Sequence, residues 1–267
     1  MRENRVKKAL KEGKVVIGTM VSEVRSPGIA QMLATAGFDF MVIDLEHSGF
    51  SIQTVADLIL GARAAGITCI VRVPSKKGHH LLSRPLDVGA QGLLVPQVET
   101  KEEVVEIIKA TKYYPLGQRG MALRRIHSDF VRKDALEITR SANEQTLIIL
   151  QIESKKAIDG LDELLSVEGV DAALIGPNDL SQSLGIPGQT THPKEIEYIG
   201  KMVNICKEHN VPSGIHLGSV EALKKWINEG MRLIMVSSDI NMIVETAARL
   251  VRELREVAKN IKEGEVV

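Results

Sequence analysis

Short runs of apolar, often β-branched residues recur eight times along this chain and alternate with longer amphipathic stretches. Runs that are apolar almost throughout are typical of parallel strands covered on both faces. Stretches with helical periodicity lie between them, among them residues 52–64, 101–111, 194–208 and 220–229. The eight expected strands are VVIGT (15–19), FMVID (40–44), CIVRV (69–73), GLLVP (92–96), LIILQIE (147–153), AALIG (172–176), PSGIH (212–216) and RLIMV (232–236).

Eight strand–helix units predict a closed (β/α)8 barrel, the TIM-barrel fold of the α/β class. A chain of 267 residues can form such a barrel as one domain, here residues 1–267. An open, doubly wound sheet is the alternative. It is disfavoured because no G-x-G-x-x-G motif follows the first expected strand.

The connection after the fourth expected strand, residues 114–145, is longer than the repeat requires. Because its 119–127 part follows a strand, we expect that part to overhang the mouth of the barrel. Arg124 and Arg125 would then bind a distal carboxylate or hydroxyl of a sugar-acid-like substrate, or else point into solvent or towards a neighbouring subunit. The basic residues of this connection are Arg119, Arg124, Arg125 and His127.

A terminal helix is expected over residues 240–262. Its apolar stripe (Ile243, Ala247, Leu250, Leu254, Val257 and Ile261) covers either its own barrel or a neighbouring subunit.

Composition narrows the class of protein. Lys and Arg together number 34, as do Asp and Glu, so no net charge attracts nucleic acid. The charged N-terminus (MRENRVKKALKEGK) lacks the apolar core of a signal peptide, and no apolar run approaches the ~20 residues that a membrane span needs. With only two cysteines, the chain is expected to be a cytoplasmic protein with reduced thiols.

Polar residues interrupt this apolar pattern at the carboxyl ends of the expected strands. In barrels that rim is where active sites are assembled, although a polar residue after a strand is often only a helix cap. The residues are Asp44, Glu46, His47, Arg72, Gln151, Glu153, Asn178, Asp179, His216, Ser237, Ser238 and Asp239.

Glu153 and Asp179 follow two neighbouring strands, which lie ~5 Å apart in a barrel. Two carboxylates that close together need a cation, or one of them must hold a proton. Oxygen ligands suit Mg²⁺ or Mn²⁺, with Co²⁺ as a further candidate. Alternatively, Asp179 caps a helix, and Glu153 acts as a cap or pairs with Lys155 or Lys156.

His47 and Arg72 are the candidates for proton transfer and charge stabilisation. Histidine serves as a general base near neutral pH, but a lone histidine is also often structural. A guanidinium within the run CIVRV needs an anionic partner, which is either Asp44 or an anionic substrate; we favour the substrate.

Five segments give the chain a family resemblance. In order and spacing, AGFDFMVIDLEHS, IVRVPS, LDVGAQGLLVPQVET, QIES and VDAALIGPNDLSQSLG resemble the HpcH/HpaI family of class II pyruvate aldolases, from Gly18 to Val236. The resemblance implies a (β/α)8-barrel lyase that cleaves a 4-hydroxy-2-oxo acid to pyruvate and an aldehyde. It also implies a divalent metal ion and a homo-oligomer, a hexamer that exchanges the last helix.

The resemblance also assigns roles to individual residues. Glu153 and Asp179 match the metal ligands, and His47 matches the base. Arg72 matches the residue that stabilises the enolate. Asp87, in LLSRPLDVGA, matches the acid that raises the basicity of the histidine. The positions that hold the substrate are Gln151, Asn178 through its backbone, and Asp44.

Three other functions compete with this one. A Schiff-base aldolase needs a lysine in a strand-end pocket, and none of the eight runs contains one. A malyl-CoA or citramalyl-CoA lyase needs a surface for the nucleotide, and no basic or aromatic cluster suits one. A non-catalytic barrel that binds an oxo acid would not need the metal ligands, His47 and Arg72 together.

Overall fold

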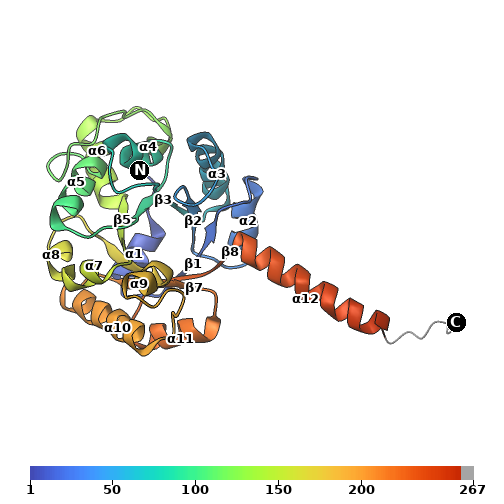
Figure 1. Cartoon of the computed structure of the whole chain (residues 1–267). Coiled ribbons are helices and arrows are strands. Elements are labelled where there is room, and N and C mark those ends of the chain that lie inside the picture. Colours follow the sequence, from blue (N-terminus) through green and yellow to red (C-terminus); the bar gives the residue numbers. More distant parts are fainter. Residues whose placement is uncertain (260–267) are drawn as a thin grey trace.

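The eight expected strands close into a barrel. The computed structural model describes residues 1–259, and in it every strand pairs in parallel with the next, β8 returning to β1 (Figure 1). The predicted (β/α)8 barrel is therefore confirmed. Its strands are β1 (Val16–Val21), β2 (Phe40–Asp44), β3 (Thr68–Arg72), β4 (Gly92–Val95), β5 (Leu147–Ile152), β6 (Ala172–Ile175), β7 (Ser213–Leu217) and β8 (Leu233–Ser238).

Alternation along the strands creates two separate cores. Ile43 and Val71 face outward into the apolar layer between the strands and the helices, whereas Val42 and Ile70 face the interior of the barrel. The interior is filled by side chains, so tightly that a Cβ on Gly18 would lie 2.3 Å from the Phe40 ring. The lumen is therefore open only towards its ends.

Helices surround the barrel (Figure 1). Their ends follow from local sequence: Thr100 and Glu103 form a capping box at the start of α5, and Gly66 adopts the left-handed cap after α3. The helices are α1 (Arg5–Lys11), α2 (Gly28–Thr35), α3 (Ile52–Ala65), α4 (His79–Asp87), α5 (Lys101–Thr111), the short 3-10 helix η1 (Ile126–Ser128), α6 (Ala135–Gln145), α7 (Lys155–Asp159), α8 (Leu161–Leu165), α9 (Pro177–Ser183), α10 (Pro193–Glu208), α11 (Val220–Asn228) and α12 (Asp239–Lys259).

The amino-terminal end of the barrel is closed by α1, which contributes apolar side chains to the interior core. Beside it, two buried lysines share one carboxylate. Lys7 Nζ lies 2.7 Å and Lys112 Nζ 3.8 Å from the nearer Asp171 oxygen, and both ammonium groups donate to the carbonyl of Thr146 at 2.7 Å. Burial lowers the pKa of Lys112 to about 7, although Asp171 acts to raise it.

The long connection lies at this same end of the barrel, not over the mouth. Arg119 pairs with Asp87 in the last turn of α4, and Asp129 pairs with Arg2 and Arg63. The prediction that residues 119–127 overhang the mouth is therefore wrong. The connection begins only after α5, and a helix returns the chain to the amino-terminal side of the strands before the loop starts.

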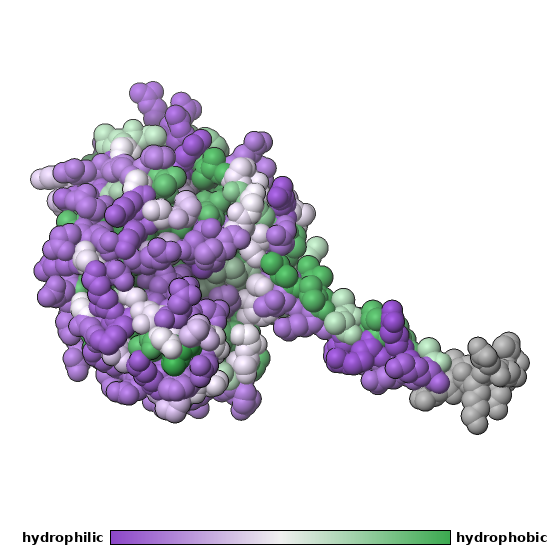
Figure 2. Space-filling model, in the orientation of Figure 1, coloured by the Kyte–Doolittle hydropathy of each residue, from purple (hydrophilic) through white to green (hydrophobic). Residues whose placement is uncertain are grey.

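The terminal helix α12 extends away from the barrel (Figure 1). Of its residues only Asp239 is buried, so the predicted helix does not cover its own barrel. In Figure 2 green and pale green side chains lie along this helix, most densely next to the barrel. The exposed ones are Ile240, Ile243, Val244, Leu250, Val251, Leu254 and Val257. The last predicted positions, 260–262 with Ile261, lie outside the described residues.

Membrane association through a spanning helix finds no support in residues 1–259. None of their helices combines the length and the apolar character that a membrane crossing needs.

Candidate active site

Inward-facing polar side chains form the last layer of the lumen at the carboxyl ends of the strands. Four of them stand two residues beyond an apolar residue of the interior core, as Asp44 follows Val42 and Arg72 follows Ile70. Because side chains alternate along a strand, they point into the same space. The layer consists of Asp44, Arg72, Gln151, His216 and Ser237.

Arg72 and Asp44 are register partners on neighbouring strands and form a two-point ion pair. Arg72 Nε donates to Asp44 Oδ1 at 2.8 Å, and Nη2 donates to Oδ2 at 2.7 Å. Burial acts to raise the pKa of Asp44, but the Arg72 fork holds it below its ordinary value. The anionic partner of Arg72 is thus Asp44 rather than a substrate alone, because the two strands bring them into register.

The turn after β2 carries the other two groups of the E-H motif. Asp44 Oδ1 accepts from the backbone amides of Glu46 at 2.9 Å and His47 at 3.4 Å, and so fixes this turn. The Glu46 side chain is only 8% exposed, with Oε2 3.3 Å from Arg72 Nη1, yet that oxygen has no hydrogen-bond partner. The His47 side chain is 64% exposed, with Nε2 3.7 Å from Glu46. It therefore stands at the mouth.

Glu153 directly follows β5 and is held from three directions. Its Oε1 accepts from the Gln97 backbone amide at 2.6 Å, and its Oε2 accepts from Gln151 Nε2 at 2.5 Å. On the remaining side is Gly176, where any Cβ would lie 2.6 Å from Oε2. The carboxylate is therefore buried, and these contacts fix its direction.

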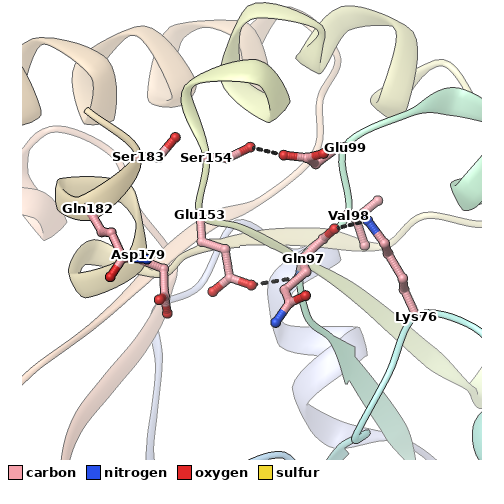
Figure 3. A pocket seen from close by; sticks show the side chains of 9 residues that line it. All are labelled: Lys76, Gln97, Val98, Glu99, Glu153, Ser154, Asp179, Gln182 and Ser183. Carbon is pink, nitrogen blue, oxygen red and sulfur yellow. Dashed lines mark hydrogen bonds between the residues drawn. The ribbon is translucent and has the colours of Figure 1, made fainter. Parts of the chain in front are cut away.

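Asp179 lies in the first turn of α9 and faces Glu153 across a cavity of about 450 Å³ (Figure 3). The one lysine among the lining residues, Lys76, is already paired with Glu103 at 2.7 Å and donates to the Gln97 carbonyl. The other lining residues are Gln97, Val98, Glu99, Ser154, Gln182 and Ser183.

Negative charge accumulates here. Burial raises the pKa of Glu153, and the charges of Glu46 and Asp179 raise it further. Burial likewise raises the pKa of Glu46, with Arg72 opposing and Asp179 adding to the rise. Since the charge of Arg72 is already matched by Asp44, a cation placed among these three carboxylates would lower their electrostatic energy.

The structural alternatives for the carboxylate pair are excluded by the local contacts. The N-cap of α9 is Gly176, not Asp179, and the N-cap of α7 is Ser154, not Glu153. The two lysines that Glu153 was expected to pair with instead contact Asp159 and Glu99. Neither carboxylate is accounted for by helix capping or by a lysine.

Two of the predicted site residues, Asn178 and Asp87, are not among the residues that line this cavity. Asn178 is exposed in the first turn of α9, beside Asp179, and its carbonyl accepts from Ser181 Oγ at 2.6 Å. Asp87 ends α4 at the amino-terminal side, where Arg119 donates to it at 2.5 Å. Within one chain, therefore, Asp87 and His47 lie at opposite ends of the barrel and do not meet.

Gln97 is a site residue that was not predicted from the sequence. Its backbone has a φ of 57°, a conformation unusual for a residue other than glycine. This directs the amide at Glu153, while the side chain donates to Glu46 Oε1 at 3.2 Å. A polar residue directly after the run GLLVP was the available signal.

A parallel barrel with an acidic, concave site at the carboxyl ends of its strands defines a (β/α)8-barrel enzyme. Residues 19–246 match the sequence profile of a family described as HpcH/HpaI aldolase/citrate lyase, and the chain belongs to this family.

Individual relatives agree with this assignment. The chain is 34% identical over 255 residues to the hydroxypyruvate/pyruvate aldolase of Roseobacter denitrificans, covering 95% of this chain and 98% of that one. It is 32% identical over 248 residues to the 5-keto-4-deoxy-D-glucarate aldolase of Shigella sonnei, covering 92% and 95%. The crystal structure of an HpcH/HpaI aldolase from Desulfitobacterium hafniense superposes with a TM-score of 0.90 at 34% identity, covering 96% and 97%.

Proposed function

We propose that this protein is a metal-dependent aldolase that reversibly cleaves a 4-hydroxy-2-oxo acid to pyruvate and an aldehyde. The observation that carries the proposal is the carboxylate pair of Glu153 and Asp179 facing one cavity, with Arg72 and His47 on the adjoining rim. Its relatives named as pyruvate and keto-deoxy-glucarate aldolases support the same reaction class.

The donor set fits a hard divalent cation such as Mg²⁺, Mn²⁺ or Co²⁺. Residues 1–259 contain no cluster of three or more His, Cys, Asp or Glu side chains arranged for a metal. Glu153 and Asp179 would therefore supply two ligands, and water and a 2-oxo acid the remaining ones. The uncompensated charge of the acidic cluster supports this assignment.

His47 and Arg72 have distinct tasks in the cleavage direction. His47 takes the proton of the C4 hydroxyl, directly or through a water, and the C3–C4 bond breaks. The electron pair moves towards C2, and Arg72 stabilises the oxygen of the pyruvate enolate that forms. The aldehyde leaves, and a proton returned to C3 completes pyruvate. A divalent cation, when bound, withdraws electron density from the 2-oxo group.

The substrate carboxylate and carbonyl belong at the Glu153 end of the cavity. Gln151 Nε2 is positioned there beside Glu153, and the backbone of Asn178 lies in the first turn of α9 next to Asp179. We assign substrate binding to both. Asp44 acts on the substrate through Arg72, whose guanidinium it orients. We assign Nη1 to the enolate; it lies 3.3 Å from Glu46 Oε2 but is not hydrogen-bonded to it.

A homo-oligomer, a hexamer by family resemblance, completes the proposal. The apolar face of α12 has no cover within its own chain. Asp87 reaches a His47 only if that histidine belongs to another copy, because the two residues occupy opposite ends of one barrel. Its side chain is 32% exposed and so accessible to a neighbouring subunit.

Pyruvate release from a panel of 4-hydroxy-2-oxo acids, with and without a chelator, tests this function. We expect release that disappears on chelation and returns with Mn²⁺ or Mg²⁺. If no member of the panel releases pyruvate, the alternative of a non-catalytic barrel that binds an oxo acid is favoured. Borohydride trapping of a pyruvate adduct would instead indicate a Schiff-base enzyme, for which Lys76, paired with Glu103, is the lysine in the cavity.

A further inference from the structure

His216 is the one histidine that faces the lumen at the carboxyl ends of the strands, among the described residues, and the proposed reaction gives it no task. It follows Ile215, which packs in the outer core, so alternation along β7 turns the imidazole inward. The charges of Arg72 and Asp44 both reach it. It therefore borders the space in which the substrate would react.

A bulge in β8 holds this imidazole in place. Between Gly18 and Met20 of β1, the paired strand β8 advances by one extra residue, from Met235 to Ser238. Ser237 consequently has a φ of 56°.

The Ser237 carbonyl accepts two hydrogen bonds. His216 Nε2 lies 2.7 Å from it, and Thr19 Oγ1 lies 3.2 Å from it. The carbonyl can only accept, so Nε2 carries the hydrogen.

The other ring nitrogen is left as an acceptor. Burial holds the pKa of His216 below its usual value, although the Ser237 carbonyl acts to raise it, so the ring is neutral at physiological pH. A neutral ring that donates from Nε2 presents a lone pair at Nδ1. Within residues 1–259 that atom has no hydrogen-bond partner, and it is not among the buried atoms.

We propose that His216 determines substrate choice by accepting, at Nδ1, a hydrogen bond from a hydroxyl group on the carbon next to a reacting carbonyl. The inference rests on the proposed aldolase function. It favours α-hydroxycarbonyl substrates over their deoxy counterparts, because a site built around a hydrogen-bond acceptor loses that bond when the hydroxyl is missing. An anionic group beside Nδ1 is disfavoured, because a lone pair repels it.

Such a hydroxyl has two possible sources, the aldehyde or the 2-oxo acid. Four reactions separate them: pyruvate or hydroxypyruvate as the donor, each with propionaldehyde or glycolaldehyde as the acceptor. For wild type we expect a higher kcat/KM with the hydroxylated member of one pair. In His216→Phe that preference should fall by about tenfold, the usual effect of one lost neutral hydrogen bond, with little change for the deoxy member. The pair whose preference collapses identifies the source.

Two further variants separate recognition from support of the bulge. His216→Asn keeps an acceptor at the position of Nδ1 and loses the donor to Ser237, whereas His216→Gln keeps the donor and loses the acceptor. We expect Asn to retain the hydroxyl preference and Gln to lose it. The opposite result, or equal losses for hydroxylated and deoxy substrates in every variant, would overturn the proposal. If wild type joins none of the four pairs although it releases pyruvate from the panel of 4-hydroxy-2-oxo acids, this inference alone fails; if it does neither, the aldolase function fails as well.

Discussion

Arg72 is joined to Asp44 by two parallel hydrogen bonds between neighbouring strands. Asp44 Oδ1, which accepts one of them, also accepts from the His47 backbone amide and so fixes the turn that carries His47. The group that would stabilise the enolate and the group that would take the proton are therefore positioned by one carboxylate. A change in the two-point pair of Arg72 and Asp44 should therefore disturb the positions of both Arg72 and His47.

Replacing Arg72 by lysine should lower kcat by roughly 10²–10³ although the charge is retained. Lysine lacks the planar fork, so it cannot hold both Asp44 oxygens and still reach the substrate. Pyruvate release under saturating substrate measures the effect. The matched control is Arg63→Lys, which alters an arginine paired with Asp129 at the amino-terminal end and should stay close to wild type. Equal turnover in both variants would assign Arg72 to structure.

The metal assignment predicts that Glu153→Gln and Asp179→Asn each abolish Mn²⁺ binding in calorimetry and pyruvate release. The control is Glu99→Gln, in the same cavity but bound to Ser154 and Lys156, which should leave both intact. Because burial and like charges raise the pKa of Glu153, its ionised form is unfavourable, and Glu153→Gln should melt at a higher temperature in metal-free buffer. Retained Mn²⁺ affinity in either ligand variant would contradict the assignment.

Sequence alone located the barrel and its rim because apolar strand runs and the polar residues ending them are both local signals. It did not show that Arg72 and Asp44 are partners, since that depends on the register of two strands. The backbone of Gln97, at a φ of 57°, has no residue-type signature.

The positions of residues 119–127 and Asp87 depend on the direction of the helices that precede or contain them. Strand order alone does not give that direction, so the loop was placed at the wrong end of the barrel.

The buried lysine at the barrel's amino-terminal end should make stability depend on pH. The folded pKa of Lys112 is lowered to about 7 from an ordinary 10.5, so between these values the unfolded chain holds a proton that the folded chain has released. Stability contributed by this group therefore rises with pH across that window, by at most about 1.4 kcal/mol per pH unit.

In Lys112→Met this rise should disappear, which denaturant unfolding at pH 7, 8 and 9 would measure as a stability difference from wild type that changes with pH. Lys109→Met, at an exposed lysine paired with Glu106, should keep the wild-type slope. Parallel curves for Lys112→Met and wild type would show that Lys112 keeps its proton throughout.

The last prediction concerns α12. A helix whose apolar face is uncovered over most of its length is stable in water only if something covers that face, and a second copy of the chain is the partner that the proposed oligomer supplies. Leu254, 71% exposed in one chain, should then be buried between subunits. Placing a charge there by Leu254→Lys should weaken assembly by roughly a hundredfold or more, because a buried unpaired ammonium costs several kcal/mol.

Light scattering after size exclusion at low micromolar concentration would show the fall in mass. Glu256→Gln makes the same change in charge on the opposite face of the helix, and should assemble as wild type does. If Leu254→Lys keeps the wild-type mass, the α12 face is not the surface through which the subunits assemble. If wild type is itself a monomer, the proposed oligomer is wrong, and Asp87 has no route to a His47.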